Sequence, residues 1–169
     1  MSGTITVRRF RADEWQAFKN IRLKALETDP HVFGASLEDS RAYPDKKWQE
    51  DVMLEHVGIF GVFAEKELIG MTGIAKLEEE GAAVLWGSWL EPVWRGKGVS
   101  EKMYAARLDW AHERADITHI VVSHRESNVE SRRANQKAGF KYTYSKPRTW
   151  HDGMTEDEMF YRLDLGSIS

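Results

Sequence analysis

The stretch Trp89-Leu90-Glu91-Pro92-Val93-Trp94-Arg95-Gly96-Lys97-Gly98-Val99-Ser100 decides how the rest of this chain folds. The apolar residues 83–90 lead into it with the composition of a strand, and a helical pattern follows it from Val99 to about Arg114. Pro92 ends the strand because proline has no N–H to donate to a ladder. The stretch therefore predicts a strand that passes through a glycine turn directly into a helix.

A glycine turn at the start of a helix suits an anion. The first N–H groups of a helix have no partner within it and lie at its positive end. Gly96 and Gly98 can adopt positive φ and let a ligand approach the backbone, and Arg95 and Lys97 add positive charge. An ordinary tight turn would use the same glycines, but together these residues predict a site for a phosphate or pyrophosphate.

Two motifs in the chain resemble motifs of the GNAT N-acetyltransferase superfamily. The segment Arg95–Ser100 resembles that family's acyl-CoA pyrophosphate loop, Gln/Arg-x-x-Gly-x-Gly/Ala, with serine in the last position. Asn128, followed by Lys137-Ala138-Gly139-Phe140, resembles the family's Asn-x-x-Ala-x-x-Leu-Tyr-x-Lys-x-Gly-Phe segment. The motifs have the family's order and separation, and the resemblance extends from about Thr4 to Leu165.

The resemblance implies an α/β (α+β) fold: a mixed, mostly antiparallel sheet flanked by helices, with a β-splay at the acyl-CoA site. The pattern of elements agrees, because hairpin strands in the middle of the chain are followed by an alternation of strands and helices. The length of 169 residues suits one core, so we expect a single domain over residues 1–169.

The resemblance also implies acetyl-CoA as cosubstrate and no metal. The residues it assigns to CoA binding are Trp89, Leu90, Arg95, Gly96, Lys97, Gly98, Val99, Ser100 and Asn128. Leu90 is the best choice for a catalytic backbone N–H that polarises the thioester carbonyl. Asn128 would lie near the pantetheine arm, although it would also serve as an ordinary helix cap.

The group that protonates the leaving thiolate is open. The family often has tyrosine at the position that aligns here with Asn135, and asparagine can hydrogen-bond sulfur but cannot replace a phenol as proton donor. Ser131, Tyr104 and Tyr144 are alternatives that the sequence does not rank. Water, or an unassisted departure of the thiolate, would also serve.

The base that accepts the amine proton is equally open. Counting by twos from Leu90 places Ser88, Trp86 and Val84 on one face of the strand, and none of these is a base near neutral pH. His124 has a suitable unperturbed pKa of roughly 6.5, and the other choices are Glu126, Glu91, Glu38 and a water chain. Three tryptophans, Trp86, Trp89 and Trp94, are expected at or near the acyl tunnel, where they would favour a short acyl group.

Composition bounds the partners and the location. The net charge of −3 and the pI near 6.1 argue against a general nucleic-acid or membrane-surface binder. The chain has no cysteine, which excludes disulfides and a Cys nucleophile. No apolar run approaches the roughly 20 residues of a membrane span, and the N-terminal residues do not resemble a signal peptide. We expect a cytoplasmic protein.

These observations predict direct transfer of an acetyl group from acetyl-CoA to a primary amine of a small molecule or a peptide. Assembly into a homodimer is compatible with the resemblance. One alternative is a non-catalytic acyl-CoA-binding regulator that has lost its acid–base groups. Another is a nucleotide-binding protein of a different class, although Gly98 after Lys97 departs from the Walker ending.

Overall fold

The computed structural model describes residues 3–166, whose strands form one seven-stranded sheet in the order β1-β2-β3-β4-β5-β7-β6. The strands are β1 (Ile5–Arg9), β2 (Val57–Ala64), β3 (Glu67–Lys76), β4 (Ala82–Leu90), β5 (His119–Arg125), β6 (Lys141–Thr149) and β7 (Thr155–Asp164). Neighbouring strands pair antiparallel except β4 and β5, which run parallel. The predicted mixed, mostly antiparallel sheet is confirmed.

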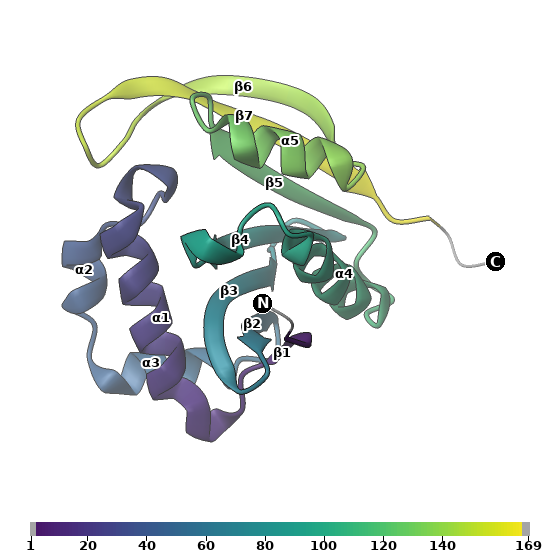
Figure 1. Ribbon diagram of the computed structural model, residues 1–169. Coiled ribbons are helices and arrows are strands. Elements are labelled where there is room, and N and C mark those ends of the chain that lie inside the picture. The colour runs from purple at the N-terminus through teal and green to yellow at the C-terminus, as the bar shows by residue number, and fades with distance from the viewer. Residues whose placement is uncertain (1–2, 167–169) are drawn as a thin grey trace.

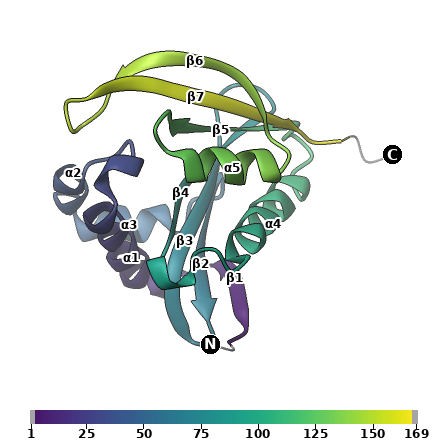
Figure 2. The same ribbon diagram turned by 45° about the horizontal axis from the view of Figure 1, so that its top comes forward.

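Helices cover both faces of this sheet (Figure 1, Figure 2). The helices are α1 (Trp15–Thr28), α2 (Leu37–Arg41), α3 (Asp45–Asp51), α4 (Val99–His112) and α5 (Val129–Lys137). On one face α1 and α3 bury Phe18 and Trp48 in a core shared with β2 and β3. On the other face α4 buries Met103 and Trp110 against the sheet. We call these the α1 face and the α4 face.

The two parallel strands pair for only part of their length. Ala82, Ala83 and Val84 pair with His119, Ile120 and Val121, and the pairing ends there. Both strands continue, β4 to Leu90 and β5 to Arg125, while β5 stays paired with β7. Figure 1 shows β4 and β5 moving apart toward their carboxyl ends. This separation is the splay that the fold class implies.

A β-bulge interrupts β4 beside the splay. Trp86 pairs with Gly73 and Trp89 with Met71, so Gly87 and Ser88 together oppose Thr72. Gly87 has φ +68°, which glycine adopts without a steric cost. The extra residue moves every earlier side chain of the strand to the other face.

The bulge corrects the face that sequence counting gives. Leu90 packs with α4, and Ser88 Oγ accepts a hydrogen bond from Arg107 on α4, so these two do share the α4 face. Trp86 instead packs into the core of the α1 face. The expectation that Trp86 and Val84 share a face with Leu90 is wrong, because it assumed an unbroken alternation.

Within residues 3–166, no helix combines the length and the apolar character that a membrane crossing requires.

Candidate functional site

The loop before α4 presents its backbone to solvent. Gly96 and Gly98 have φ of +75° and +79°, and Gly98 is the N-cap of α4. A Cβ added at either glycine would meet nothing within 4 Å, so positive φ rather than crowding requires glycine. Residues 95–98 are exposed, and the helix that follows has fourteen residues. The first N–H groups of α4 therefore face open space, as an anion site needs.

The two basic side chains of the loop differ in what they contact. Arg95 donates from Nε to Leu90 O at 2.9 Å and from Nη2 to Asp29 Oδ2 at 2.8 Å. Burial alone would raise the pKa of Asp29, but the hydrogen bonds from Arg95 and Trp89 outweigh it and lower the pKa. Arg95 thus fastens the loop to α1, while the exposed Lys97 lies beside the Trp94 ring at 5.6 Å.

The amide of Leu90 points into the splay. Glu91 N donates to Ile69 O at 2.8 Å, and Leu90 is paired with Gly70. Antiparallel residues alternate between pairs that exchange hydrogen bonds and pairs that do not. Leu90 therefore directs its N–H and C=O away from β3, toward the edge from which β5 has separated.

A phenol from α4 meets Asn135 from α5. Tyr104 donates its hydroxyl to Asn135 Oδ1 at 2.5 Å, and both side chains are largely or fully buried. Burial raises the pKa of Tyr104, and the neighbouring Arg107 offsets part of that rise. The hydroxyl therefore stays protonated at neutral pH and lies next to the residue that occupies the family's tyrosine position.

Arg107 places a buried positive charge under the splay. Its Nε donates to Met103 O at 3.1 Å and its Nη1 to Ser88 Oγ at 2.9 Å, and its Cζ lies 4.7 Å from the Tyr104 ring centroid. Burial lowers the pKa of Arg107 to about 10, which leaves it charged at neutral pH. Ser88 itself is exposed, so this network reaches the surface of β4.

A buried carboxylate lies on the α1 face of the separated strand β5. Glu158 on β7 is 8% exposed and accepts a hydrogen bond from Ser123 Oγ at 2.6 Å. Arg148 Nη1 donates to its other oxygen at 3.2 Å. Ser123 lies two residues beyond Val121, the last residue of β5 that pairs with β4, so this carboxylate borders the splay.

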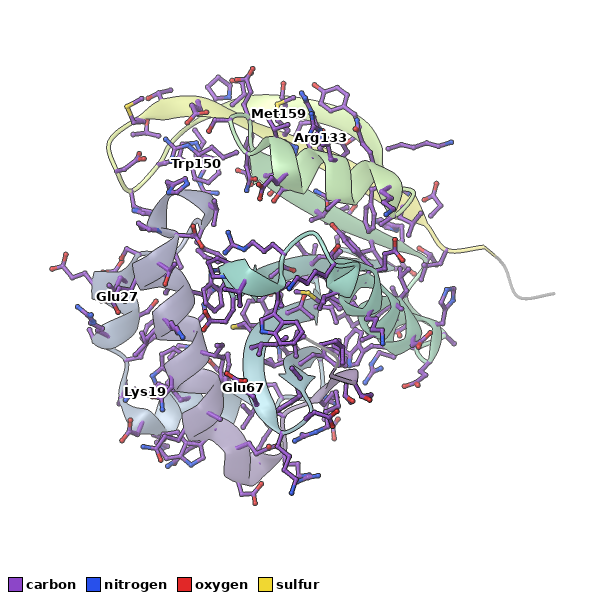
Figure 3. The ribbon with its side chains drawn as sticks, viewed as in Figure 1. Lys19, Glu27, Glu67, Arg133, Trp150 and Met159 are labelled. Atoms are coloured by element: carbon purple, nitrogen blue, oxygen red, sulfur yellow. The ribbon has the colours of Figure 1, made fainter. Side chains whose placement is uncertain are left out.

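The β6–β7 turn and the segment after α1 close over this face. His151 Nε2 lies 2.7 Å from Pro30 O and 3.0 Å from Phe33 O. Arg148 lies over the Trp150 ring at 4.4 Å, and a Cβ added at Gly34 would be 2.8 Å from Arg148 Nη2. Figure 3 shows Trp150 between the β6–β7 hairpin and the end of α1. Segments far apart in the sequence thus form one wall.

Comparison with known proteins fits this geometry. The family model described as an acetyltransferase (GNAT) domain matches residues 4–141, most of the chain. The chain belongs to the GNAT acetyltransferase family.

Several GNAT relatives resemble the chain. The ribosomal-protein-serine acetyltransferase of Escherichia coli (strain K12) is 28% identical over 111 residues; these cover 64% of this chain and only 60% of that relative. RimL, a ribosomal L7/L12 alpha-N-protein acetyltransferase solved with coenzyme A, has a TM-score of 0.76 at 20% identity and 97% and 96% coverage of the two chains. YncA of Salmonella typhimurium, solved with acetyl-CoA, has 0.78 at 17% identity and 98% and 96% coverage. At these identities the structures establish the fold.

The tryptophans are not arranged as the sequence suggests for this GNAT chain. Trp89 is buried in the core of the α1 face, where Nε1 donates to Asp29 Oδ2 at 2.7 Å, and Trp94 is buried beneath the loop. The Trp89 side chain therefore faces away from the α4 face that Leu90 occupies. Trp86 also lies on the α1 face, at the bulge, but its Nε1 has no hydrogen-bond partner within the described residues.

The predicted polar residues of the GNAT site are partly occupied with structural bonds. His124 Nδ1 lies 2.7 Å from Arg125 O and Nε2 lies 3.1 Å from Tyr161 Oη. Burial lowers the pKa of His124, so the ring is neutral and both nitrogens are engaged. Asn128 accepts from Ser131 N at 3.1 Å through Oδ1, which caps α5 as predicted.

Sequence reasoning missed Glu158, Ser123 and Arg107. Ser123 and Glu158 are 35 residues apart and meet only through the pairing of β5 with β7. Arg107 is buried on α4 together with four apolar residues. Its position among apolar residues on the buried side of α4 was a signal that the sequence did offer.

Proposed function

We propose that this protein is an N-acetyltransferase that moves an acetyl group from acetyl-CoA directly to a primary amine. The observation that carries the proposal is the end of β4–β5 pairing at Val84, beside the free N–H groups of the loop before α4. A diphosphate fits those N–H groups, and an extended pantetheine arm fits between two separated strands. The bound CoA in YncA and RimL supports the same ligand here.

The loop residues Arg95–Ser100 take different parts in this proposal. The pyrophosphate is held by the backbone N–H groups of Gly96, Gly98, Val99 and Ser100. Val99 contributes only its backbone, because its side chain is buried. Lys97 adds an exposed cation, and Arg95 positions the loop through Asp29. Asn128 contributes its remaining amide N–H groups to the pantetheine, and Trp89 contributes only as the neighbour that orients Leu90.

Leu90, Glu158 and Tyr104 carry the chemistry. The N–H of Leu90 polarises the thioester carbonyl. Glu158 accepts the amine proton directly or through one water, and Ser123 orients it. The amine nitrogen then bonds to the carbonyl carbon, the C–S bond breaks, and Tyr104, held by Asn135, protonates the departing thiolate. His124 takes no part, because both ring nitrogens are engaged.

These groups weigh against the regulator alternative. That alternative rested on Asn135 and on an apolar strand face, which suggested that the acid–base groups were lost. Tyr104 beside Asn135 and Glu158 beside the splay supply both functions from other elements.

The acceptor we favour is the N-terminal amine of a peptide. Two of the relatives described above are a ribosomal-protein-serine acetyltransferase and an alpha-N-protein acetyltransferase. A small-molecule amine remains the alternative acceptor, and its test is a comparison of both classes in one assay. Assembly into a homodimer and a cytoplasmic location stay predictions from the sequence.

The test measures CoA release from an amine panel in the wild type, and the Kd for acetyl-CoA in the wild type and in Gly98→Asp, with Gly98→Asn as matched control. Both replacements meet the same φ of +79° and the same open space, and asparagine tolerates that φ as well as aspartate does. We expect Gly98→Asp to weaken acetyl-CoA binding at least 100-fold, because its carboxylate faces the pyrophosphate, and Gly98→Asn to weaken it less than 10-fold. Equal affinities for acetyl-CoA in the two variants would remove the loop from the site.

A further inference from the structure

Arg22 on α1 has a guanidinium nitrogen, Nη1, that makes no hydrogen bond within the described residues. Its Cζ lies 5.2 Å from the Phe33 ring centroid and 5.6 Å from that of Trp86. Its Nη1 is completely buried and has no hydrogen-bond partner within residues 3–166. The indole Nε1 of Trp86 is buried and unpartnered as well. Two neighbouring donors thus lack an acceptor.

Among residues 3–166, no carboxylate offsets the charge of Arg22. Burial lowers the pKa of Arg22 to about 10, and only Tyr43 acts against that fall. The group still carries its charge at neutral pH. Arg22 is partly buried, whereas two arginines that are fully buried have partners: Arg107 has two hydrogen bonds, and Arg125 pairs with Asp152 and Glu156. A buried charge without a partner is costly, and an anion from outside the chain would relieve that cost.

Arg22 borders the same part of the α1 face as Glu158. A Cβ added at Gly87, in the bulge of β4, would lie 3.4 Å from Arg22 Nη1. Phe33, which contacts Arg22, is followed by Gly34, and the Arg148 side chain lies against Gly34. Arg148 in turn donates a hydrogen bond to Glu158. Gly87 is three residues before Leu90, which corresponds to at most roughly 10 Å along the strand because the bulge shortens this step.

We propose that Arg22 binds a carboxylate of the acceptor, so that the preferred acceptor is a peptide with an acidic residue after its N-terminal residue. The inference rests on the proposed function and adds a substrate class to it. In a free amino acid the α-carboxylate and the amine are attached to the same carbon. Such a carboxylate does not reach Arg22 while its amine lies beside Leu90. A side-chain carboxylate one residue further along an extended peptide reaches roughly 10 Å from the amine.

The test compares the peptides Ser-Glu-Ala-amide and Ser-Gln-Ala-amide, which differ only in charge. They are assayed with wild type, Arg22→Gln and the control Lys19→Gln. Lys19 lies one turn earlier on α1 and pairs with Asp45 of α3 at 2.8 Å (Figure 3). We expect wild type and Lys19→Gln to favour the Glu peptide at least 10-fold in kcat/KM, and Arg22→Gln to lose that preference. A preference that persists in Arg22→Gln, or is missing in the wild type, overturns the proposal.

A binding measurement separates this inference from the proposed function. Calorimetry with CoA present gives the Kd of the two N-acetylated peptides without turnover. If the Glu peptide binds more tightly in an Arg22-dependent way but no amine gives CoA release, the proposed function is contradicted and the carboxylate site is supported. If CoA is released but both peptides have the same Kd, the proposed function is supported and the carboxylate site is contradicted. Melting curves check folding, and we expect Arg22→Gln to melt no lower than the wild type, because it removes an unpaired buried charge.

Discussion

Glu158 is a carboxylate that the protein orients without neutralising fully. Ser123 donates to one oxygen and Arg148 to the other, at 2.6 and 3.2 Å. A serine hydroxyl fixes the direction of a carboxylate and leaves its second lone pairs free to accept a proton. The side chain of Arg148 is 38% exposed, so its ion pair with Glu158 is weakened by solvent. This arrangement suits a base that receives a proton from an incoming amine.

Glu158→Gln tests that role, since the change keeps the shape and removes the charge. We expect kcat for CoA release to fall at least 100-fold, because glutamine cannot accept the amine proton, while the Kd for acetyl-CoA changes less than 3-fold. Asp164→Asn, at the exposed end of the same strand, is the control. A kcat within 3-fold of the wild type would assign the base to another group or to water.

At the scale of the elements, α4 and α5 act as one unit. Each follows a strand that borders the splay, and they meet through the Tyr104–Asn135 hydrogen bond and an exposed ion pair between Glu101 and Lys137. The exposed pair contributes little to stability, whereas the part-buried hydrogen bond is less open to replacement by water. The phenol is thus held where the two helices approach the separated strands.

Tyr104→Phe removes the hydroxyl alone. We expect kcat to fall about 10- to 100-fold through loss of the proton donor, and stability to fall by about 1–3 kcal/mol because Asn135 Oδ1 is left unpaired. Steady-state kinetics and urea unfolding measure the two effects. The matched control is Tyr142→Phe on β6, whose side chain is half exposed. If the rate of Tyr104→Phe equals that of the control, the hydroxyl is structural only.

At the scale of the whole molecule, the sheet consists of two halves. One contains β1 to β4, the other contains β5 to β7, and three residue pairs of β4 and β5 join their strands. The loop of β4 and the cap of α5 belong to different halves. A ligand that contacts both would strengthen a junction that the strands alone hold by a short ladder.

We expect acetyl-CoA to raise the melting temperature. At 100 times its Kd, a ligand that binds only the folded chain adds about 2.7 kcal/mol, which for this size corresponds to roughly 5–10 °C. Thermal melts with ATP and NAD in parallel are the controls for other nucleotide ligands, and Gly98→Asp should lose the shift. A larger shift with ATP or NAD would instead favour the nucleotide-binding alternative.

The residues near one another in the sequence were the ones that sequence reasoning placed well. The strand, the turn and the helix around Gly96 and Gly98 depend on local dihedral preferences and on N–H groups that every helix start exposes, so the loop was predictable. The hairpin strands in the middle of the chain were expected from the sequence, and Asn128 capped its helix as expected. None of these features requires knowledge of a distant residue.

Tertiary structure decided the rest. The bulge at Gly87 turned Trp86 to the other face, a change that period-two counting cannot detect. Tyr104 met Asn135, and Ser123 met Glu158, across more than 30 residues of chain. The proposed acid, the proposed base and the carboxylate site proposed at Arg22 all depend on burial and on partners distant in the sequence. The sequence by itself determined where a diphosphate could bind, whereas packing determined which side chains face the reaction, because a proton donor or acceptor is made by its surroundings.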